Sequence, residues 1–384
     1  MEKIHAPARL ASCECLTSFG GTGATLAAML RGERALRPAP VLGADGGELV
    51  PLAFFPGRPR DAEQPRAWLG ILKAFFEPVS GPGWGTPRRP VVVASSNFGV
   101  GHLHAYRRAG SPSNSPHAAH GAVHKSVAAL CEACGWGPNV AIFSHACVSA
   151  HLGLVHAARL LALRDGGGRA LVDEALVVAY DLLSPFVTGG FYSLKILNAG
   201  YPAPYMERAS GSIGLGDGAA WAVLAREGGE FQIAAQSLHN EMFHFTANQP
   251  DGAGFAAVLA PVARAAAGLR VWVKGHGTGT LEAGRLEAAA VAAAFPGAPL
   301  AGWKGALGHT LGSCGLVELA IAAAAMRKTA AHAPPRAPGT IGAGAPTFVA
   351  QVATAPFETG GFDGVVCMSN AFGGAHAALL LLRD

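Results

Sequence analysis

The stretch Asn139-Val-Ala-Ile-Phe-Ser-His-Ala-Cys147-Val-Ser-Ala-His151 passes directly from an apolar strand pattern into a helical pattern. Residues 139–144 form a short apolar run typical of a buried strand, and residues 149–162 carry apolar side chains at helical spacing. A strand followed at once by a helix is the basic unit of α/β proteins, so this stretch predicts that fold class.

The same alternation continues on both sides of this stretch. Apolar runs typical of strands occupy residues 90–95, 174–180, 219–226 and 377–383, and a helical pattern covers residues 123–133. The last two strand runs each follow a glycine-rich turn and end in an arginine and an acidic residue. We therefore expect an α/β fold with parallel or mixed sheets covered by helices, and the repeated unit fits two similar halves.

The composition is that of a chain with a large core. Half of the 384 residues are hydrophobic and only 14% are charged, and a chain of this length buries a large share of its surface. The net charge of +4 is too small to predict nucleic-acid binding, although it suits an acidic partner. No run of five or more like charges is present.

Neither a targeting segment nor a membrane span is predicted. The N-terminus, Met1-Glu-Lys-Ile-His5, lacks a long apolar segment. The alanine-rich stretches 286–294 and 316–326 are too short or too interrupted to cross a bilayer. We therefore expect a soluble, cytoplasmic protein that does not associate with membranes.

The seven cysteines are expected to be reduced thiols. Their number is odd and the chain shows no secretion signal, which argues against a disulfide framework. Cys13, Cys15, Cys131 and Cys134 are candidates for a four-thiolate zinc site. However, Cys131 and Cys134 lie in the helical pattern at 122–135, where buried free cysteine is common, so no metal is predicted.

Cys147 is a candidate nucleophile because it lies at the junction of the strand and the helix. A side chain there is exposed on a sharp turn, and the unpaired N–H groups of the helix N-terminus are expected to lower the thiol pKa. The same N–H groups can stabilise an oxyanion. The alternative interpretation of Cys147 is a small buried apolar residue.

Two histidines stand in strings that are unusual for ordinary turns. Lys274-Gly-His276-Gly-Thr278-Gly-Thr280 follows a strand pattern at 269–273, and its glycines let the backbone approach a ligand closely. His309 precedes an apolar helix, with Lys304 five residues before it and Glu318 nine residues after it. The alternatives are a turn histidine at 276 and, at 309, a helix-capping histidine with solvated charged neighbours.

A fourth candidate string is Ser369-Asn-Ala-Phe372-Gly-Gly-Ala-His376, for which plain core packing is the alternative. The other histidines considered show no HExxH or other zinc-ligand spacing, so they are interpreted as structural or pocket-lining. They are His145, His151, His156, His239 and His244. A P-loop, a dinucleotide-binding glycine motif and a Gly-x-Ser-x-Gly elbow are all missing from the sequence. Neither a nucleotide cofactor nor a serine hydrolase is therefore predicted.

Taken together and in this order, the four strings resemble the β-ketoacyl-ACP synthase (ketosynthase) family of the thiolase superfamily. That family has a cysteine in an Ala-Cys-x-Ser-like turn, then His-Gly-Thr-Gly-Thr, then Lys-x-x-x-Gly-His, then a closing Gly-Phe-Gly-Gly loop. The resemblance covers nearly the whole chain. Weaker matches are Asp181-Leu-Leu-Ser-Pro-Phe186 and Arg208-Ala-Ser-Gly-Ser-Ile-Gly-Leu-Gly-Asp-Gly-Ala219.

The resemblance implies a thiolase fold, with five layers in the order α-β-α-β-α and two pseudo-symmetric halves. Residues 1–229 would form the half that carries the nucleophile, and residues 230–384 the half that carries the two histidines. The resemblance also implies a dimer with active sites near the interface. This dimer would be a homodimer or a heterodimer with a chain-length-factor-like subunit.

The implied reaction is the decarboxylative Claisen condensation of an acyl thioester with malonyl-ACP in fatty-acid or polyketide chain elongation. Cys147 would hold the acyl chain delivered by the acyl carrier protein, because a thiolate is both a good nucleophile and a good leaving group. Substrates would be carried on the phosphopantetheine of that protein, with no other cofactor. His276 and His309 would assist decarboxylation and hold the enolate oxygen as neutral N–H donors.

Further roles come from the same resemblance. Lys304 and Glu318 match the family's supporting ion pair near the second histidine. The backbone N–H groups of Cys147 and Phe372 would form the oxyanion hole, and Phe372 would also gate the pocket. The positions expected to bind substrate are Thr278, Thr280, Gly373 and Gly374.

Three departures from the family pattern concern substrate and partner choice. Ala283-Gly284 stands where the family often has Asn-Asp, Ala375-His376 stands for Thr-Asn in the closing loop, and His145 stands where small residues or threonine are usual. None is expected to touch the proposed chemical groups. They favour a specialised synthase for polyene- or polyketide-like chains over a housekeeping fatty-acid enzyme.

Two other functions stay open at this point. A ketosynthase-like acyltransferase would load Cys147 and pass the acyl group to an alcohol or amine without decarboxylation. A subunit of the chain-length-factor type would pair with an active synthase, although such subunits usually lack the nucleophile. The chain is equally compatible with being the active half of such a heterodimer.

Overall fold

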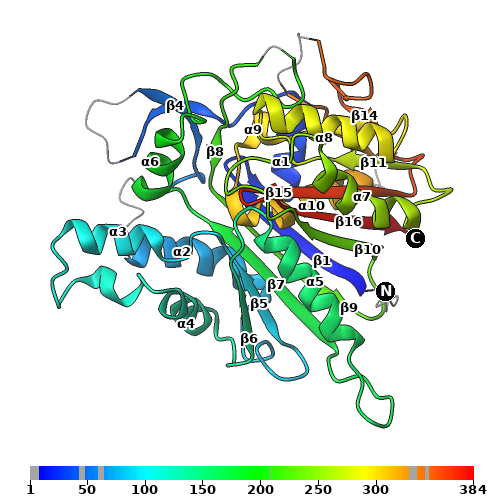
Figure 1. Ribbon diagram of the computed structural model, residues 1–384. Coiled ribbons are helices and arrows are strands. Elements are labelled where there is room, and N and C mark those ends of the chain that lie inside the picture. The colour runs from blue at the N-terminus through cyan, green and yellow to red at the C-terminus, as the bar shows by residue number, and fades with distance from the viewer. Residues whose placement is uncertain (1–7, 43–47, 59–64, 208, 328–334, 342–345) are drawn as a thin grey trace.

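The computed structural model describes residues 8–42, 48–58, 65–207, 209–327, 335–341 and 346–384 (Figure 1). Met1–His5 and Arg208, which entered the sequence analysis, lie outside the described residues. Strands alternate with helices along the chain, and most strands join one 11-stranded mixed sheet. The expected α/β class is therefore confirmed.

Strands from the first part of the chain lie in the order β1-β9-β7-β5-β6. β5 is parallel to β6 and β7, whereas β9 is antiparallel to β7 and β1. All four residues of β5 are buried, so its sequence is a continuous apolar run without alternation. The bounds are β1 Ala8–Thr17, β2 Gly20–Gly21 (paired with β1), β5 Val91–Ala94, β6 Val140–Phe143, β7 Glu174–Asp181 and β9 Gly218–Ala225.

Strands from the second part repeat this order as β10-β16-β15-β11-β12. β11 is parallel to β12 and β15, and β16 is antiparallel to β15 and β10. The two turn-and-strand units recognised in the sequence correspond to β9 and β16, which occupy equivalent places. The bounds are β10 Phe231–Asn240, β11 Val271–Lys274, β12 Leu300–Ala301, β15 Gly364–Ala371 and β16 Ala375–Arg383.

The two sets of strands meet where β1 pairs with β10. This pairing is antiparallel and short, with Ala8 opposite Ile233 and Leu10 opposite Phe231. It makes the two halves one continuous sheet. The division after residue 229 falls in the turn between β9 and β10 and stays a prediction.

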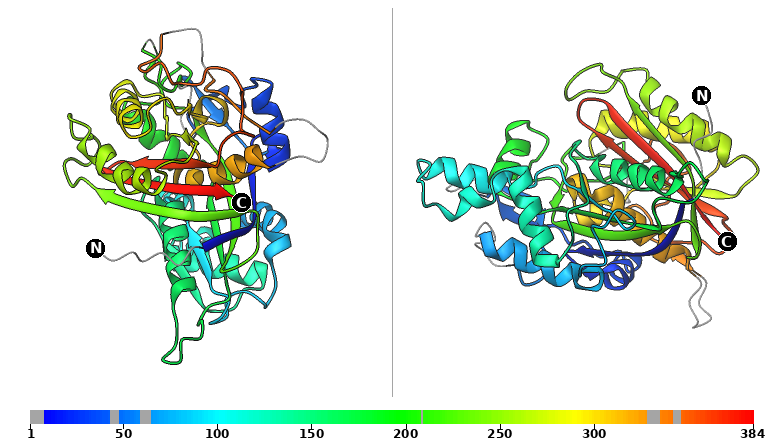
Figure 2. Two further views of the ribbon diagram at one scale, coloured as in Figure 1. Left: turned by 90° about the vertical axis from the view of Figure 1, so that its right-hand side faces the viewer. Right: turned by 90° about the horizontal axis from the view of Figure 1, so that it is seen from below.

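Helices form three layers around the strands (Figures 1 and 2). α5 (Ser149–Ala162) and α10 (Cys314–Met326) pack on each other in the middle layer. Apart from Glu318, α10 carries apolar or small residues on all sides, because nearly the whole helix is buried. α2 (Pro65–Phe76) and α4 (Val123–Cys134) cover the first half, and α7 (Ala253–Ala265) and α8 (Leu281–Ala294) cover the second. The expected five-layer α-β-α-β-α arrangement is confirmed.

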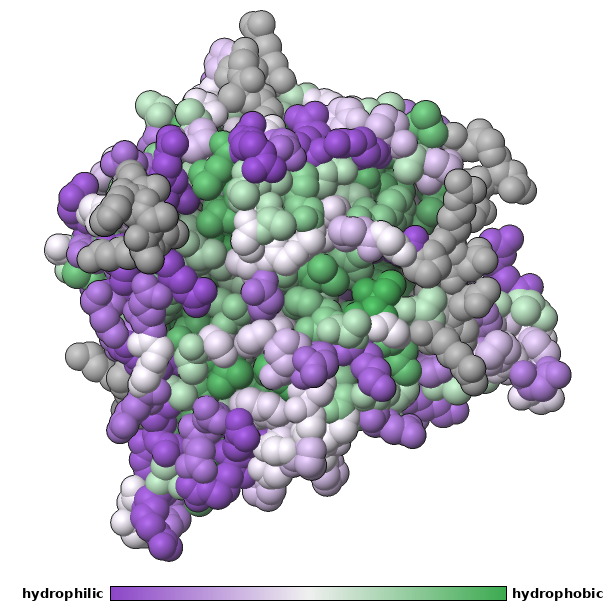
Figure 3. Space-filling model, turned by 180° about the vertical axis from the view of Figure 1, so that it is seen from behind, coloured by the Kyte–Doolittle hydropathy of each residue, from purple (hydrophilic) through white to green (hydrophobic). Residues whose placement is uncertain are grey.

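Smaller elements surround this core. Their bounds are β3 Arg37–Pro40, β4 Leu49–Ala53 and β8 Leu215–Gly216 in one sheet, β13 Arg336–Ala337 and β14 Phe357–Glu358 in another, α1 Thr22–Leu30, α3 Val100–Arg108, α6 Pro185–Ser193, α9 Lys304–Leu307, and the 3-10 turns Glu77–Val79, Pro116–Ala119 and Leu311–Ser313. Among the described helices, none is long and apolar enough to cross a bilayer. The face opposite to that of Figure 1 has apolar and weakly polar residues across its centre, in keeping with the low charge content (Figure 3).

Candidate active site

Cys147 lies in the turn between β6 and α5, as the sequence predicts. The preceding residue, Ala146, has a φ of +43°, in the left-handed region that residues other than glycine seldom adopt. Ser149 secures the turn, because its Oγ accepts the N–H of His145 at 2.8 Å and donates to the carbonyl of Ala146 at 2.6 Å. The Cys147 side chain lines a cavity of about 250 Å³.

His309 is held beside this cavity by the backbone that follows α9. Its N–H donates to the carbonyl of Gly214 at 2.7 Å, and its own carbonyl accepts the N–H of Gly216 at 3.0 Å. A Cβ at Gly216 would lie 2.4 Å from the carbonyl oxygen of Leu307, so this close approach requires glycine. The glycine-rich string before β9 therefore positions His309.

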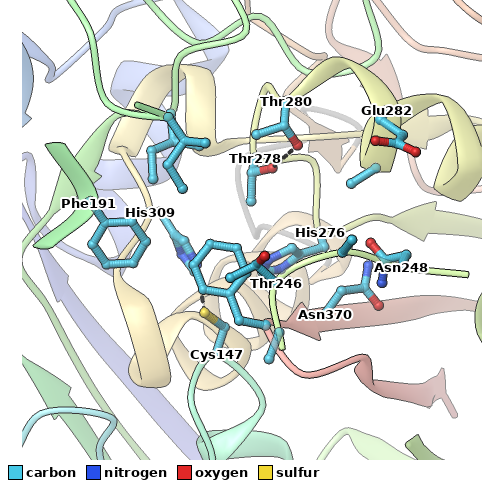
Figure 4. A pocket seen from close by; sticks show the side chains of 16 residues that line it. Cys147, Phe191, Thr246, Asn248, His276, Thr278, Thr280, Glu282, His309 and Asn370 are labelled. Atoms are coloured by element: carbon cyan, nitrogen blue, oxygen red, sulfur yellow. Dashed lines mark hydrogen bonds between the residues drawn. The ribbon is translucent and has the colours of Figure 1, made fainter. Parts of the chain in front are cut away.

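Hydrogen bonding defines where the ring proton of His309 lies. The N–H of Leu311 donates to Nδ1 at 3.2 Å, which makes Nδ1 an acceptor and leaves the proton of the neutral ring on Nε2. Nε2 lies 3.0 Å from Sγ of Cys147 (Figure 4). The imidazole thus directs an N–H at the sulfur of Cys147.

His276 follows β11 and faces His309. The two rings are nearly perpendicular, with centroids 5.0 Å apart. Glu287 of α8 accepts the backbone N–H groups of His276 and Gly277 at 2.5 and 3.0 Å, which holds the loop in place. Sγ of Cys147 and nitrogens of both histidines all lie within 4.8 Å of one another. The structure therefore brings together the three residues proposed as catalytic from the sequence.

Sulfur and imidazole nitrogen are also donors that Zn²⁺ accepts. Within the described residues, Cys147, His276 and His309 are the one group with the spacing of metal ligands. The four cysteines considered as a zinc site form no such group. Cys13 and Cys15 lie in one hydrophobic cluster, whereas Cys134 lies in another with Cys131 packed against it.

Glu318 lies between two buried lysines. Its Oε1 is 2.8 Å from Nζ of Lys304, and its Oε2 accepts a hydrogen bond from Lys274. Lys304 also donates to the carbonyl oxygen of His276 at 2.8 Å. Neither Lys304 nor Glu318 lines the cavity, and Glu318 reaches the His276 loop only through Lys304. No role was predicted for Lys274, although a lysine that ends a buried strand signals a buried partner.

The surroundings of His276 and His309 favour the neutral form of both rings. Burial lowers the pKa of His276 and of His309 well below the usual range, and the positive charges of Lys304 and Lys274 lower both further. A neutral imidazole can donate an N–H to a developing enolate oxygen without carrying a proton that would quench the carbanion. The electrostatics therefore suit the donor role expected for these rings.

The pKa of Cys147 is raised, so the prediction that the helix N-terminus lowers it was wrong. Burial is the largest cause, nearby Cys314 adds to it, and the charge of Lys304 opposes it. Desolvation of a buried thiolate outweighs the positive potential at the start of α5. The directions of both pKa shifts therefore favour a thiol beside a neutral imidazole.

The mouth of the cavity contains three further predicted residues. Phe372 is 39% exposed, and its ring centroid lies 6.0 Å from that of Phe191. Thr278 and Thr280 line the cavity with their Oγ1 atoms 3.1 Å apart (Figure 4). Gly373 and Gly374 instead form the turn between β15 and β16, with φ values of +85° and +71°. They stand beside the cavity wall without lining it.

Other residues that line the cavity were not identified from the sequence. They come from segments far apart in the chain, which no local pattern connects, and are Phe191, Ile196, Ile213, Thr246, Ala247, Asn248, Glu282, Ala283, Asn370 and Ala371. Of these, Ile213, Asn370 and Ala371 stand in strings quoted above without a role, and Ala283 was noted only as a departure from the family pattern. The wall is thus apolar on one part and carries amide and hydroxyl groups on another.

Comparison with known proteins shows two sequence relationships. The family model "Beta-ketoacyl synthase, C-terminal domain" matches residues 231–336. The 3-oxoacyl-[acyl-carrier-protein] synthase 2 of Coxiella burnetii is 29% identical over an alignment of 272 positions, and the match covers 64% of this chain and 62% of that protein. The chain thus spans about three fifths of the length of that relative.

Two solved structures share the fold over their full length. A ketosynthase in complex with its chain length factor from Xenorhabdus doucetiae has a TM-score of 0.77 and 20% identity, with 100% of both chains covered. A ketosynthase bound to a hexaketide, in complex with a type II polyketide acyl-carrier protein, has a TM-score of 0.78 and 16% identity. Its match covers 98% of this chain and 99% of that one.

Proposed function

We propose that this chain, which belongs to the β-ketoacyl synthase family, catalyses the decarboxylative condensation of an acyl thioester held on Cys147 with malonyl-ACP. One observation carries the proposal. The sulfur of Cys147 lies 3.0 Å from Nε2 of His309, and nitrogens of two neutral imidazoles lie within 4.8 Å of it in a single cavity. This arrangement suits a reaction that needs one nucleophile and two donors for an enolate oxygen.

In the first half-reaction, the sulfur of Cys147 attacks the carbonyl carbon of acyl-ACP as its thiol proton leaves. The backbone N–H groups of Cys147 and Phe372 stabilise the oxyanion that forms. The intermediate then expels the phosphopantetheine thiolate, which takes up the proton that Cys147 released. The acyl group remains as a thioester on Cys147.

In the second half-reaction, malonyl-ACP loses CO₂, and the electron pair of the broken C–C bond forms an enolate. Its oxygen accepts N–H bonds from His276 and His309. The enolate carbon attacks the acyl thioester, a C–C bond forms, and the Cys147 thiolate leaves and is protonated. The products are 3-oxoacyl-ACP, CO₂ and the free enzyme.

The remaining predicted residues act around this centre. Lys304 and Glu318 hold the loop of His276, as the bond from Lys304 to its carbonyl supports. Thr278 and Thr280 offer hydroxyl groups at the cavity wall for the amide groups of the phosphopantetheine arm. Phe372 gates the cavity and supplies one N–H of the oxyanion hole.

We also propose that the chain dimerises along β6, either with itself or with a chain-length-factor-like subunit. β6 ends the sheet order, and Ile142 on it is 41% exposed. Among the described residues no strand pairs with its outer side, whereas β12 at the opposite end is bridged by Val352. An unpaired edge strand with apolar side chains is a natural pairing surface.

The edge proposal is tested by Ile142→Lys, which puts a charge on β6. Sedimentation should show a loss of dimer for this variant. Leu269→Lys is the control, because Leu269 is similarly exposed, at 37%, and lies before β11. Equal dimerisation of both variants would refute pairing at β6.

We place the protein in the cytoplasm and assign it to fatty-acid or polyketide chain elongation. All seven cysteines are free thiols, which suits a reducing compartment.

The departures at Ala283, Gly284 and His376 favour a specialised acyl chain. Ala283 lines the cavity, and His376 contacts Asn370, which also lines it.

The function is tested with malonyl-ACP labelled at its free carboxyl carbon and a panel of acyl-ACPs. We expect labelled CO₂ and 3-oxoacyl-ACP products identified by mass, and Cys147→Ala should abolish both. Acylation of Cys147 without CO₂ release would indicate the acyltransferase alternative. Failure of Cys147 to acylate unless a partner subunit is added would indicate that the chain works in a heterodimer.

A further inference from the structure

Three polar side chains form a hydrogen-bonded chain that starts at the cavity wall and leads into the protein. Asn370 lines the cavity near the end of β15, and its Oδ1 lies 2.9 Å from Nδ1 of His376 on β16. Nε2 of His376 lies 2.9 Å from Oε1 of Glu241. The side chains of His376 and Glu241 are fully buried and do not line the cavity. The chemistry proposed above uses neither residue.

Glu241 connects this chain to a second part of the cavity wall. Its Oε2 accepts the N–H of Gln249 at 2.8 Å, directly after the wall segment 246–248. Its own N–H donates to the carbonyl oxygen of Gly374 at 2.9 Å, in the turn that begins with Phe372. Glu241 thus connects the wall segment 246–248 with the turn at 372–374.

The surroundings of Glu241 are shaped for its side chain. A Cβ at Gly254 would lie 2.0 Å from Oε1 of Glu241, and a Cβ at Gly374 would lie 2.9 Å from its Cβ. Either clash would displace the carboxylate. The two glycines therefore provide the space in which Glu241 can meet His376.

The ring of His376 can bond to its two neighbours in two ways. In the structure the amide oxygen of Asn370 faces Nδ1, so Nδ1 carries a proton and the amide NH₂ points away from the ring. If Nδ1 instead has no proton, it accepts an N–H from Asn370, and the amide oxygen points away. The proton on His376 thus decides whether Asn370 offers a donor or an acceptor at the cavity.

The groups that influence the pKa of His376 are its immediate neighbours in the fold. Burial lowers the pKa of His376, and its hydrogen bond and charge interaction with Glu241 oppose this. His239, the cross-strand partner on β10, stacks on the ring with centroids 6.5 Å apart and also lowers the pKa. Phe255 packs against the ring at 4.5 Å and carries no charge.

We propose that His376 is a positioning residue that sets the hydrogen-bonding group Asn370 presents to the substrate and keeps the two wall segments together. The inference rests on the proposed function, because an acyl or malonyl thioester must occupy this cavity. His376 is also one of the departures from the family pattern. It touches none of the three catalytic side chains, yet it reaches the cavity through Asn370.

A double-mutant cycle tests whether His376 acts through Asn370. His376→Phe and Asn370→Ala should each lower kcat/KM for the acyl-ACP substrate by about 10-fold. The double variant should be no worse than the poorer single variant, because both changes remove the same interaction. Losses that multiply, to about 100-fold, would overturn the proposal.

The pH dependence supplies a readout that a purely structural role would not move. The kcat/KM of the wild-type protein should change with pH as His376 titrates, and His376→Phe should lack that step. His239→Asn is the matched control, because it removes the neighbouring imidazole but leaves the chain of hydrogen bonds intact. It should keep the step, and a step that survives in His376→Phe would refute the assignment.

Two further measurements keep the outcomes distinct. If His376→Phe does not fold, as judged by thermal melting, His376→Gln takes its place in the cycle, since glutamine can bond to both neighbours but cannot titrate. Release of CO₂ by the wild-type protein is measured first. Absence of CO₂ release would contradict the proposed function. If CO₂ is released but the kcat/KM losses of the two single variants multiply in the double variant, only the role of His376 is contradicted.

Discussion

Replacing Glu318 with glutamine should destabilise the protein more than any single surface change. The carboxylate pairs with Lys274 and Lys304, whose side chains have no exposed surface, and its own side chain is 3% exposed. Glutamine keeps the size but removes the charge, so two buried ammonium groups lose their counter-ion. Breaking a buried ion pair by removing one partner costs about 3–5 kcal/mol.

The expected change in melting temperature follows from the size of the chain. The entropy of unfolding is about 2.1 cal/mol/K per residue, or about 0.8 kcal/mol/K for a chain of this length that unfolds as one unit. A loss of about 4 kcal/mol then lowers Tm by ~5 °C. Thermal melting followed by circular dichroism measures this change directly.

Glu230→Gln provides the matched control. Glu230 pairs with Arg327 at 3.3 Å, and both side chains are more than 40% exposed. A surface pair of this kind contributes about 0–1 kcal/mol. If Glu318→Gln lowered Tm no more than Glu230→Gln does, the buried lysines would not depend on Glu318 for their charge balance, and the reasoning would fail.

Three further predictions concern the turn at Cys147 and the two histidines that face it. Because the pKa of Cys147 is raised, its alkylation by iodoacetamide should accelerate about tenfold per pH unit between pH 7 and 9; a rate that levels off below pH 8 would contradict this. Ala146→Val, at a φ of +43°, should lower the free energy of unfolding in urea by about 1–3 kcal/mol. Ala146→Gly should change it by less than about 1 kcal/mol, and equal effects would disprove the strain. His276→Ala and His309→Ala should each slow CO₂ release by about 10²–10³-fold, while His276→Ala still allows Cys147 to acylate, as measured by protein mass.

The sequence predicted those features that depend on local patterns. The helix over 149–162 matches α5 at both ends, because its apolar spacing and the turn at Cys147 are continuous in the chain. The repeated turn-and-strand unit corresponds to β9 and β16 in equivalent places. The meeting of Cys147, His276 and His309 followed from the family resemblance, since no spacing in the sequence links these positions.

Features that depend on distant contacts were not predicted. Lys274 contacts Glu318 across 44 residues, and Glu241 contacts His376 across 135 residues. Neither pair has a periodicity that would reveal it. The direction of the Cys147 pKa was wrong for a related reason. The sequence showed the helix N-terminus but not how deeply the folded protein buries the thiol.

The pairing of β1 with β10 has a consequence for the newly made chain. The sulfur of Cys147 belongs to the first half, and both imidazoles belong to the second, which the ribosome completes more than 100 residues later. Domains generally fold as units during synthesis, N-terminal first. A partly made chain therefore has the thiol without the two imidazoles that face it in the complete fold. The cavity is complete only when the second half docks, because its wall includes residues from both halves.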